Sequence, residues 1–257
     1  MPALPQSVVR KLATLTFVAA TTACLGATGA LAQGGAPDYA AIIAASDRSE
    51  GDREIDKRRD PVKLLAFTGV RPGMKVLDMG AGGGYSTELM ARAVAPNGVV
   101  YGQNAPDLGG RAKENFEARL KTPVMKSTVV LLRKFDDPVP ADVRNLDLIT
   151  FFFFYHDVVN IAAVDRATMN RKLLEALKPG GFLIVAEHSA KPGQGLSVTP
   201  TLHRIEESTL RGEVEAAGFK FVEEGGFLRQ PGDPRDFNVN RRTGPVDEFV
   251  LKFQKSM

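Results

Sequence analysis

From Lys75 onward the sequence alternates apolar runs with segments of helical pattern, and this alternation constrains the fold more than any other feature. The runs are rich in Val, Ile, Leu and Phe, as expected of strands buried in a parallel sheet. Strands are predicted at 75–79, 98–103, 128–133, 146–153, 182–187, 219–224 and 247–253. Helices are predicted between them at 84–94, 110–120, 165–178 and 206–217. The pattern predicts an α/β fold, a doubly wound, seven-stranded and mostly parallel sheet that binds its ligand beyond the carboxyl ends of the strands.

The first 32 residues have the features of a cleaved secretory signal. Arg10 and Lys11 precede an uncharged, apolar segment that ends in Ala-Leu-Ala at Ala32, with a small residue at the expected cleavage site. Cleavage after Ala32 predicts a periplasmic or secreted protein that is not stably inserted in a membrane. A membrane anchor is an alternative, although the segment is rich in Ala, Thr and Gly and only just long enough to span a bilayer. Lipid attachment at Cys24 is another, because Thr-Thr-Ala-Cys loosely resembles a lipoprotein box.

Residues 33–60 are predicted to form an N-terminal extension ahead of a domain at 61–257. The extension begins with a short apolar helix, DYAAIIAA, and continues as DRSEGDREIDKRRD, whose alternating acids and bases are typical of a solvated helix or loop face. The whole chain of 257 residues has a formal net charge of +3, and its basic residues are spread among acids. A nucleic-acid partner is therefore not expected.

The glycine-rich stretch LDMGAGGGYST, residues 77–87, follows the first predicted strand. A dinucleotide fingerprint requires Gly-x-Gly-x-x-Gly, but Tyr85 or Thr87, depending on the register, stands where the third glycine is needed. A P-loop requires a lysine after its last glycine, and none occurs between Lys75 and Lys113. A nucleotide-dependent oxidoreductase and a triphosphate-binding protein are therefore disfavoured. What remains is an acid followed by alternating glycines that lead into a helix: Asp78, Gly80, Gly82 and Gly84.

This spacing resembles motif I of the class I S-adenosylmethionine-dependent methyltransferases. The same family is similar at LKPGGFLIVAE, its fifth strand, and at EVEAAGFKFVEE and DEFVLKFQK, its closing helix, sixth strand and antiparallel seventh strand. The resemblance covers residues 61–254 or so and implies a Rossmann-like methyltransferase fold with S-adenosylmethionine as cofactor. Exported bacterial proteins described as predicted methyltransferases are similar in the signal and in AGGGYSTELMA, VYGQN, FFFFYHD, EHSA and TLHRIEE.

The resemblance also implies a cofactor-binding set: Asp78, Gly80, Gly82, Gly84, Asn104 and Asp136. The glycines let the backbone approach the methionine and ribose part of the cofactor, and Asp78 receives its ammonium group directly or through water. The family places an acid at the end of the second strand for both ribose hydroxyls, whereas Asn104 stands there in this chain, so weaker cofactor affinity is expected. Asp136 is expected to meet the adenine amino group, and the alternative is that Asp136 and Asp137 are paired surface acids.

The three histidines of the chain, His156, His188 and His203, are all predicted near the carboxyl edge of the sheet. Methyl transfer is an in-line displacement at a sulfonium, so the protein mainly aligns the reactants and supplies a base where the acceptor needs one. His156, oriented by Asp157, is the first candidate for base or acceptor positioning, and His188 is the second. Ordinary loop or capping histidines are the alternative. A metal site from His156, His188 and Glu187 has no tight ligand spacing to support it, and no metal is predicted.

Together these observations predict an exported S-adenosylmethionine-dependent methyltransferase that acts on a small-molecule acceptor. The sequence does not identify the acceptor or indicate the oligomeric state. The alternative is an exported protein that binds S-adenosylmethionine or a nucleoside without transferring the methyl group. It is motivated by a conflict of compartments, because the cofactor is made in the cytoplasm and the signal predicts export.

Cleavage of the signal predicts a mature protein that begins at Gln33, because the signal peptidase would cut after Ala32. Mass spectrometry of the N-terminus of the natively produced protein should find this residue. An intact Met1 on cytosolic protein would contradict the predicted export.

Overall fold

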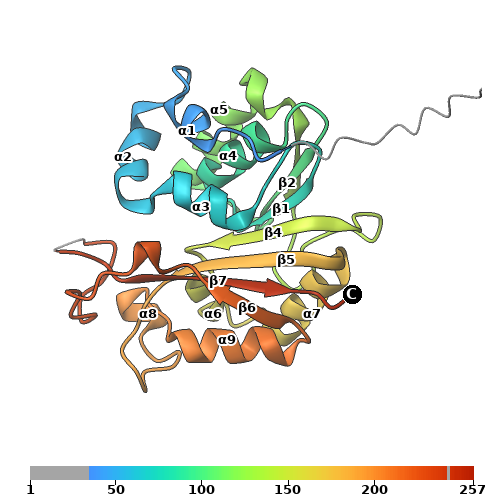
Figure 1. Cartoon of the computed structure of the whole chain (residues 1–257). Helices are drawn as coiled ribbons and strands as arrows, with labels where there is room; N and C mark the ends of the chain where they lie inside the picture. The colour runs from blue at the N-terminus through green and yellow to red at the C-terminus, as the bar shows by residue number, and fades with distance from the viewer. Residues whose placement is uncertain (1–34, 242–243) are drawn as a thin grey trace, which may run out of the picture. The chain divides into compact units, whose positions relative to one another are not determined.

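A seven-stranded sheet forms the centre of the structure, a computed structural model that describes residues 35–241 and 244–257 (Figure 1). Its strands are β1 (Lys75–Met79), β2 (Val99–Asn104), β3 (Thr128–Leu132), β4 (Leu146–Phe152), β5 (Leu177–His188), β6 (Lys220–Glu224) and β7 (Glu248–Gln254). The strand order is β3-β2-β1-β4-β5-β7-β6. Strands β1 to β5 pair in parallel, and β7 is antiparallel to both of its neighbours. The predicted α/β, doubly wound sheet with an antiparallel last strand is therefore confirmed. The predicted signal and Cys24 lie outside the described residues.

Helices cover both faces of this sheet (Figure 1). One face carries α1 (Tyr39–Ala44), α2 (Glu50–Arg59), α3 (Pro61–Thr68), α4 (Tyr85–Val94) and α5 (Gly110–Leu120). The other carries α6 (Tyr155–Val159), α7 (Arg166–Ala176), α8 (Thr199–Leu202) and α9 (Glu207–Ala216). Two 3₁₀ turns, η1 (Pro123–Ser127) and η2 (Gly226–Leu228), complete the elements of the described chain. None of the helices in residues 35–241 and 244–257 combines the length and the apolar character that crossing a membrane requires.

Two apolar cores lie on the two faces of the sheet, and β4 contributes to both. Ile149 and Phe151 are buried in the core under α7 and α9, whereas Leu148 and Phe152 are buried in the core under α3 and α4. This division follows the two-residue period of side chains along a strand. A strand covered on both faces is largely apolar, which explains the run ITFFFF, in which Thr150 is the one polar residue.

The fifth strand begins earlier than its sequence pattern predicts. Leu177 already pairs with Leu146, but regular pairing resumes only at Phe182, opposite Leu148. The Pro-Gly-Gly sequence at 179–181 occupies the irregularity between these two pairs. Proline has no N–H to donate and glycine tolerates unusual backbone angles, so this sequence forms the irregularity within the strand. Helix α7 consequently ends at Ala176.

The turn between α4 and β2 restricts the residue at position 98. An added Cβ on Gly98 would lie 2.6 Å from the backbone oxygen of Met74, which cannot move without disturbing β1. Gly98→Ala should therefore lower the free energy of unfolding by about 1–3 kcal/mol, as overpacking does. Gly212→Ala is the matched control, because this glycine lies inside α9 with no atom within 4 Å of the added Cβ. The control should raise stability by up to about 1 kcal/mol in urea unfolding. Equal effects of the two changes would contradict the steric argument.

Candidate functional site

The glycine-rich stretch forms the turn between β1 and α4, and its alternating glycines have left-handed backbone angles. The φ angle is +61° at Gly80, +53° at Gly82 and +86° at Gly84, a region of backbone angles that residues other than glycine rarely adopt. A Cβ on Gly80 would lie 2.6 Å from the ring of Phe154, and one on Gly84 would lie 2.6 Å from the ring of Phe116. Around Gly82 the nearest such atom is 4.0 Å away. Two of the glycines thus allow close packing, and Gly82 faces open space.

Two amides at the end of β2 hold this turn in place. The Oδ1 atom of Asn104 accepts a hydrogen bond from Gly82 N (2.8 Å), and its Nδ2 atom donates to Gly82 O (3.3 Å). The Oε1 atom of Gln103 accepts from Gly80 N (3.1 Å). Asn104 is 2% exposed and is therefore engaged with the glycine backbone. Its predicted contact with a ribose stays a prediction.

The carboxylate of Asp78 is bound within the fold. It accepts hydrogen bonds from the hydroxyls of Ser86 (2.8 Å), Thr87 (2.6 Å) and Thr150 (2.8 Å), and it is 1% exposed. Burial raises the pKa of Asp78, and the three hydroxyls lower it, with a net value above the usual range for an aspartate. Asp78 thus fixes α4 and β4 to β1. The predicted contact with a cofactor ammonium group stays a prediction.

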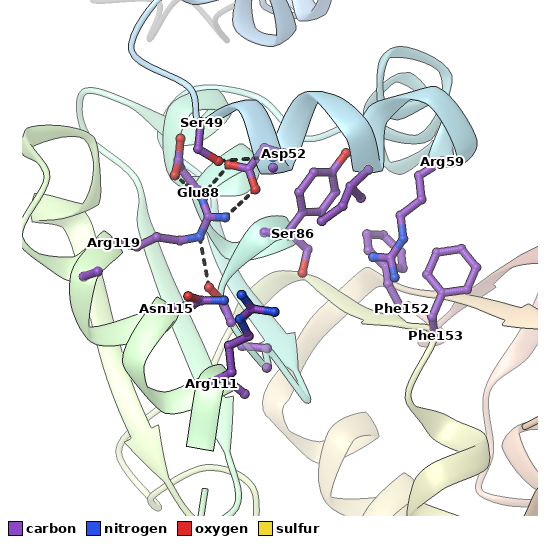
Figure 2. A pocket seen from close by; sticks show the side chains of 18 of the residues that line it. Ser49, Asp52, Arg59, Ser86, Glu88, Arg111, Asn115, Arg119, Phe152 and Phe153 are labelled. Carbon is purple, nitrogen blue, oxygen red and sulfur yellow. Dashed lines mark hydrogen bonds and ion pairs between the residues drawn. The ribbon is translucent and has the colours of Figure 1, made fainter. Parts of the chain in front are cut away.

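A cavity of about 930 Å³ opens beside the glycine turn, between α2, α4, α5 and the end of β4 (Figure 2). Its volume is within the range of small-molecule sites. The turn contributes residues 80–83, and β4 contributes Phe152 with the two phenylalanines that follow it. The side chains of Arg111 and Asn115 point into the cavity from α5 (Figure 2). Of the predicted cofactor-binding residues, Gly80 and Gly82 line this cavity.

One wall of the cavity is held by a buried network of charges. The Nη1 atom of Arg119 donates to Asp52 Oδ2 (2.7 Å), and the guanidinium also binds Glu88 (Figure 2). The Nε atom of Arg119 donates to Gly83 O (2.9 Å). Burial, the largest single cause, raises the pKa of Asp52, but the hydrogen bonds and charge of Arg119, with Ser49 and Arg48, together lower it more, so the net pKa is below the usual range. The network joins α2, α4 and α5 around the glycine turn.

Aromatic rings and a second arginine form the opposite end of the cavity. Figure 2 shows Arg59 reaching from α2 toward Phe152 and Phe153. Its guanidinium lies 4.3 Å from the ring centroid of Phe153 and 5.6 Å from that of Tyr85, within cation–π range. The Oη atom of Tyr85 donates to Asp56 Oδ1 (2.6 Å), which further joins α2 to α4.

The sequence interpretation missed the contribution of residues 47–59 to this cavity. The charged stretch that looked solvated is α2, which Ser49 caps by accepting from Asp52 N (3.1 Å). Asp52 is 2% exposed because its partner Arg119 lies on α5, far along the chain. A serine followed by acids was a visible capping signal for a helix. Nothing in the local pattern identified its buried face.

The residues of the predicted adenine contact follow β3 and lie outside the cavity lining. Asp137 binds Arg133, and it accepts a hydrogen bond from Lys172 Nζ (2.9 Å). Asp136 is half-buried and does not line the cavity. Because Asp137 is engaged by two cations, Asp136 remains the better candidate of the pair, and its contact with adenine stays a prediction.

The three histidines gather beyond the carboxyl ends of β4 and β5, as expected. The ring centroid of His156, in α6, lies 5.6 Å from that of His188 and 5.4 Å from that of His203. His188 ends β5, and its Nδ1 atom lies 3.0 Å from Glu248 Oε1. Its ring also lies 5.0 Å from that of Phe153, a cavity residue. The histidine cluster therefore adjoins the cavity.

The imidazole of His156 is oriented by Glu187. The Nδ1 atom of His156 lies 2.7 Å from Glu187 Oε2, and the backbone N–H donates to Oε1 (3.1 Å). Asp157, the predicted orienting residue, faces the other ring nitrogen, with Oδ1 3.4 Å from Nε2. Burial, the largest single cause, lowers the pKa of His156, but the carboxylates of Glu187 and Asp157 together raise it more, so the net pKa is above the usual range. The sequence analysis considered Glu187 only as a metal ligand without supporting ligand spacing, and it did not predict its contact with His156.

Comparisons with known proteins find similarity over the part of the chain that contains the glycine turn. A family model described as protein-L-isoaspartate(D-aspartate) O-methyltransferase matches residues 60–131. The protein-L-isoaspartate O-methyltransferase of Aeropyrum pernix is 32% identical over 124 residues, 48% of this chain and 42% of that protein. The ubiquinone/menaquinone biosynthesis C-methyltransferase UbiE of Ectopseudomonas mendocina is 30% identical over 132 residues, 51% of this chain and 48% of that protein. The chain thus spans less than half the length of these relatives.

Solved structures with the same architecture extend over most of the chain. An S-adenosylmethionine-dependent methyltransferase from Aquifex aeolicus has a TM-score of 0.58 at 18% identity, covering 85% of this chain and 99% of that one. An arsenic(III) S-adenosylmethionine methyltransferase from Chlamydomonas reinhardtii has a TM-score of 0.56 at 15% identity, covering 86% and 74%. The chain therefore has the Rossmann-like fold of class I methyltransferases. Both of these solved proteins are named for S-adenosylmethionine.

The wall formed by α2 should weaken in acid through Asp52. A carboxylate whose pKa is lowered by folding adds stability above its unfolded pKa of about 3.9, and this stability is lost as the pH falls through the folded pKa. Asp52→Asn should therefore lower the free energy of unfolding by about 1–3 kcal/mol at neutral pH. The difference from wild type should shrink below about pH 4.

Urea unfolding at a series of pH values measures this difference. Glu54→Gln is the matched control, because Glu54 lies on the same helix in an exposed pair with Lys57 and should change stability by less than about 1 kcal/mol. A penalty for Asp52→Asn that is the same at pH 3 as at pH 7 would contradict the assignment.

Proposed function

We propose that this chain is an S-adenosylmethionine-dependent methyltransferase with a small-molecule acceptor. The observation that carries the proposal is the glycine turn, in which three left-handed glycines follow Asp78 and two of them line a cavity of about 930 Å³. The fold of class I methyltransferases supports the same cofactor.

The chemistry of the cavity suits the parts of this cofactor. Gly82 leaves open space beside the backbone, which a flat or extended ligand can occupy. Arg59 supplies a positive charge complementary to the methionine carboxylate, and the aromatic rings of Phe152 and Phe153 supply apolar contact. We assign Asn104 and Asp136 to the ribose and adenine ends, as the resemblance implies. In this proposal Asp78 acts by holding the turn, since its carboxylate is bound to three hydroxyls.

The histidine cluster is proposed to form the acceptor side of the site. S-adenosylmethionine supplies a methyl group bound to a sulfonium sulfur. When the methyl group is transferred, the rest of the cofactor leaves as a neutral thioether. The protein aligns the acceptor with that methyl group, and His156 Nε2 takes up a proton when the acceptor must lose one. The carboxylate of Glu187, 2.7 Å from Nδ1, stabilises the resulting imidazolium. Asp157 and His188 border the same space and are proposed to position the acceptor.

The comparisons do not identify the acceptor, because the family model matches only residues 60–131, which contain the proposed cofactor-binding turn. The matched residues 60–131 contain the glycine turn and β1 to most of β3, whereas the histidine cluster follows later in the chain. The two curated relatives are named for methylation at oxygen and at carbon. The two relatives thus differ in the atom that they methylate. This is consistent with the elements that follow residue 131 selecting the acceptor.

The cofactor assignment is tested at Gly82. Asparagine tolerates left-handed backbone angles, so Gly82→Asn should fold normally while its side chain fills the space proposed for the cofactor. Calorimetry of the full-length protein with S-adenosylmethionine and S-adenosylhomocysteine should show affinity at least tenfold weaker than wild type. The matched control is Gly73→Asn, because Gly73 has a φ of +85°, equally open surroundings and a place outside the cavity.

Two results would overturn the proposal. Wild-type protein that binds neither ligand would exclude the cofactor, and equal affinities for the two variants would place the cofactor away from the glycine turn. Formation of S-adenosylhomocysteine on addition of a small-molecule extract tests methyl transfer itself.

A further inference from the structure

We propose that His156, Asp157 and His203 bind a divalent transition-metal ion. The ligand atoms are Nε2 of His156, a carboxylate oxygen of Asp157 and Nδ1 of His203. This site is separate from the cofactor cavity, and it is built from residues of the described chain alone. It does not depend on the chain being a methyltransferase. An ion on His156 Nε2 occupies the lone pair that would otherwise accept a proton, so the proton-accepting role of His156 applies only to the protein without the ion.

The distances between the ligand atoms suit a single ion. Asp157 Oδ1 lies 3.4 Å from His156 Nε2 and 3.0 Å from His203 Nδ1. One ligand atom from each of the three residues can be chosen so that all lie within 4.8 Å of one another. Bonds of about 2.0–2.2 Å from zinc to nitrogen or oxygen place two ligands of a tetrahedral ion about 3.4 Å apart. Small rotations of the two partly exposed side chains complete the set.

The buried carboxylate of Glu187 prepares His156 for this role. It lies 2.7 Å from Nδ1 and accepts the His156 backbone N–H, so the ring is fixed with Nε2 toward Asp157. Glu187 is 0% exposed, and it also accepts the backbone N–H of His188 (3.1 Å). A carboxylate on the second ring nitrogen is a common feature of metal-binding histidines, because it sets the tautomer and the orientation of the ring.

Hydrogen bonds also fix the segment that brings His203 to the site. Thr199, in α8, donates to Asn160 Oδ1 (2.8 Å), and Asn160 Nδ2 donates to the backbone oxygen of His156 (3.2 Å). His203 follows α8 with a left-handed backbone, φ +54° and ψ +47°. A histidine held in this sparsely populated conformation is more easily understood if its side chain has a task at that place.

The exposure of the ligands indicates an open metal site. His156 is 3% exposed, whereas the side chains of Asp157 and His203 are 33% and 28% exposed. Three protein ligands with one side toward solvent are typical of catalytic sites, which keep a coordination position for water or substrate. Two imidazoles and one carboxylate favour zinc, iron(II), nickel or copper over magnesium and calcium. The metal class is therefore that of imidazole-binding transition ions, with Zn²⁺ as the probe.

The same atoms form an ion-pair cluster if no metal binds, and zinc binding distinguishes the two cases. The experiment uses untagged full-length protein carrying Cys24→Ser, which removes the only thiol of the chain. After treatment with chelator and its removal, the protein is titrated with Zn²⁺ by calorimetry, without S-adenosylmethionine. The expected result is one tight site per chain. Co²⁺ should bind the same site and give the visible absorption of an ion with nitrogen ligands.

Variants identify the ligands. His203→Asn keeps a residue that tolerates the left-handed backbone, and it should weaken Zn²⁺ binding at least tenfold, as should Asp157→Asn. Glu187→Gln should weaken it about 10–100-fold by acting through His156. His188→Asn is the matched control, because His188 lies in the same cluster but outside the ligand set. It should retain Zn²⁺ affinity within a factor of about three of wild type. Circular dichroism checks that each variant is folded.

Three outcomes would overturn the metal site. They are no zinc binding by the folded wild type, unchanged binding by both His203→Asn and Asp157→Asn, and loss of binding in His188→Asn alone. Titration with S-adenosylmethionine in the presence of chelator tests the cofactor separately. Failure of the metal site is therefore distinguishable from failure of the proposed methyltransferase.

Discussion

The buried carboxylate of Asp78 is the interaction on which the rest of the site depends. It receives hydroxyls from Ser86 and Thr87 on α4 and from Thr150 on β4, so one group joins the first strand to the helix and strand beside it. A hydrogen bond to a charged group contributes about 1.5–3 kcal/mol, and loss of the carboxylate would leave two buried hydroxyls, those of Thr87 and Thr150, without this acceptor. The glycine turn lies between Asp78 and α4, and its position therefore follows from this contact.

Charge pairing then determines how the chain closes around the turn. Arg119 on α5 binds Asp52 on α2 and Glu88 on α4, and its Nε atom donates to the turn itself at Gly83. These groups are largely buried, so each charge depends on its partner, and removing one would leave another uncompensated. One end of the cavity is consequently lined by the charged side chains of Asp52, Glu88 and Arg119. The opposite end is lined by aromatic side chains, among them Phe153.

The histidine cluster shows how topology combines distant parts of the chain. Parallel strands end at the same edge of the sheet, so residues that follow β4 and β5 meet there. Phe152 pairs with Ala186, which places Glu187 beside the start of α6 and under His156. His203 arrives from a separate connection and faces Asp157. The cluster thus joins a fixed, buried imidazole to two partly exposed side chains.

The sequence by itself determined the sheet, the order of its elements and the edge at which the histidines collect. Apolar periodicity is a local property of the chain, and alternating strands and helices imply parallel strands whose carboxyl ends share one edge. It also located the glycine turn, since left-handed backbone angles require glycine at Gly80, Gly82 and Gly84. Only the tertiary structure decided which acid orients His156 and that α2 forms a cavity wall. Those outcomes depend on strand register and on partners far along the chain, and local pattern carries no information about either.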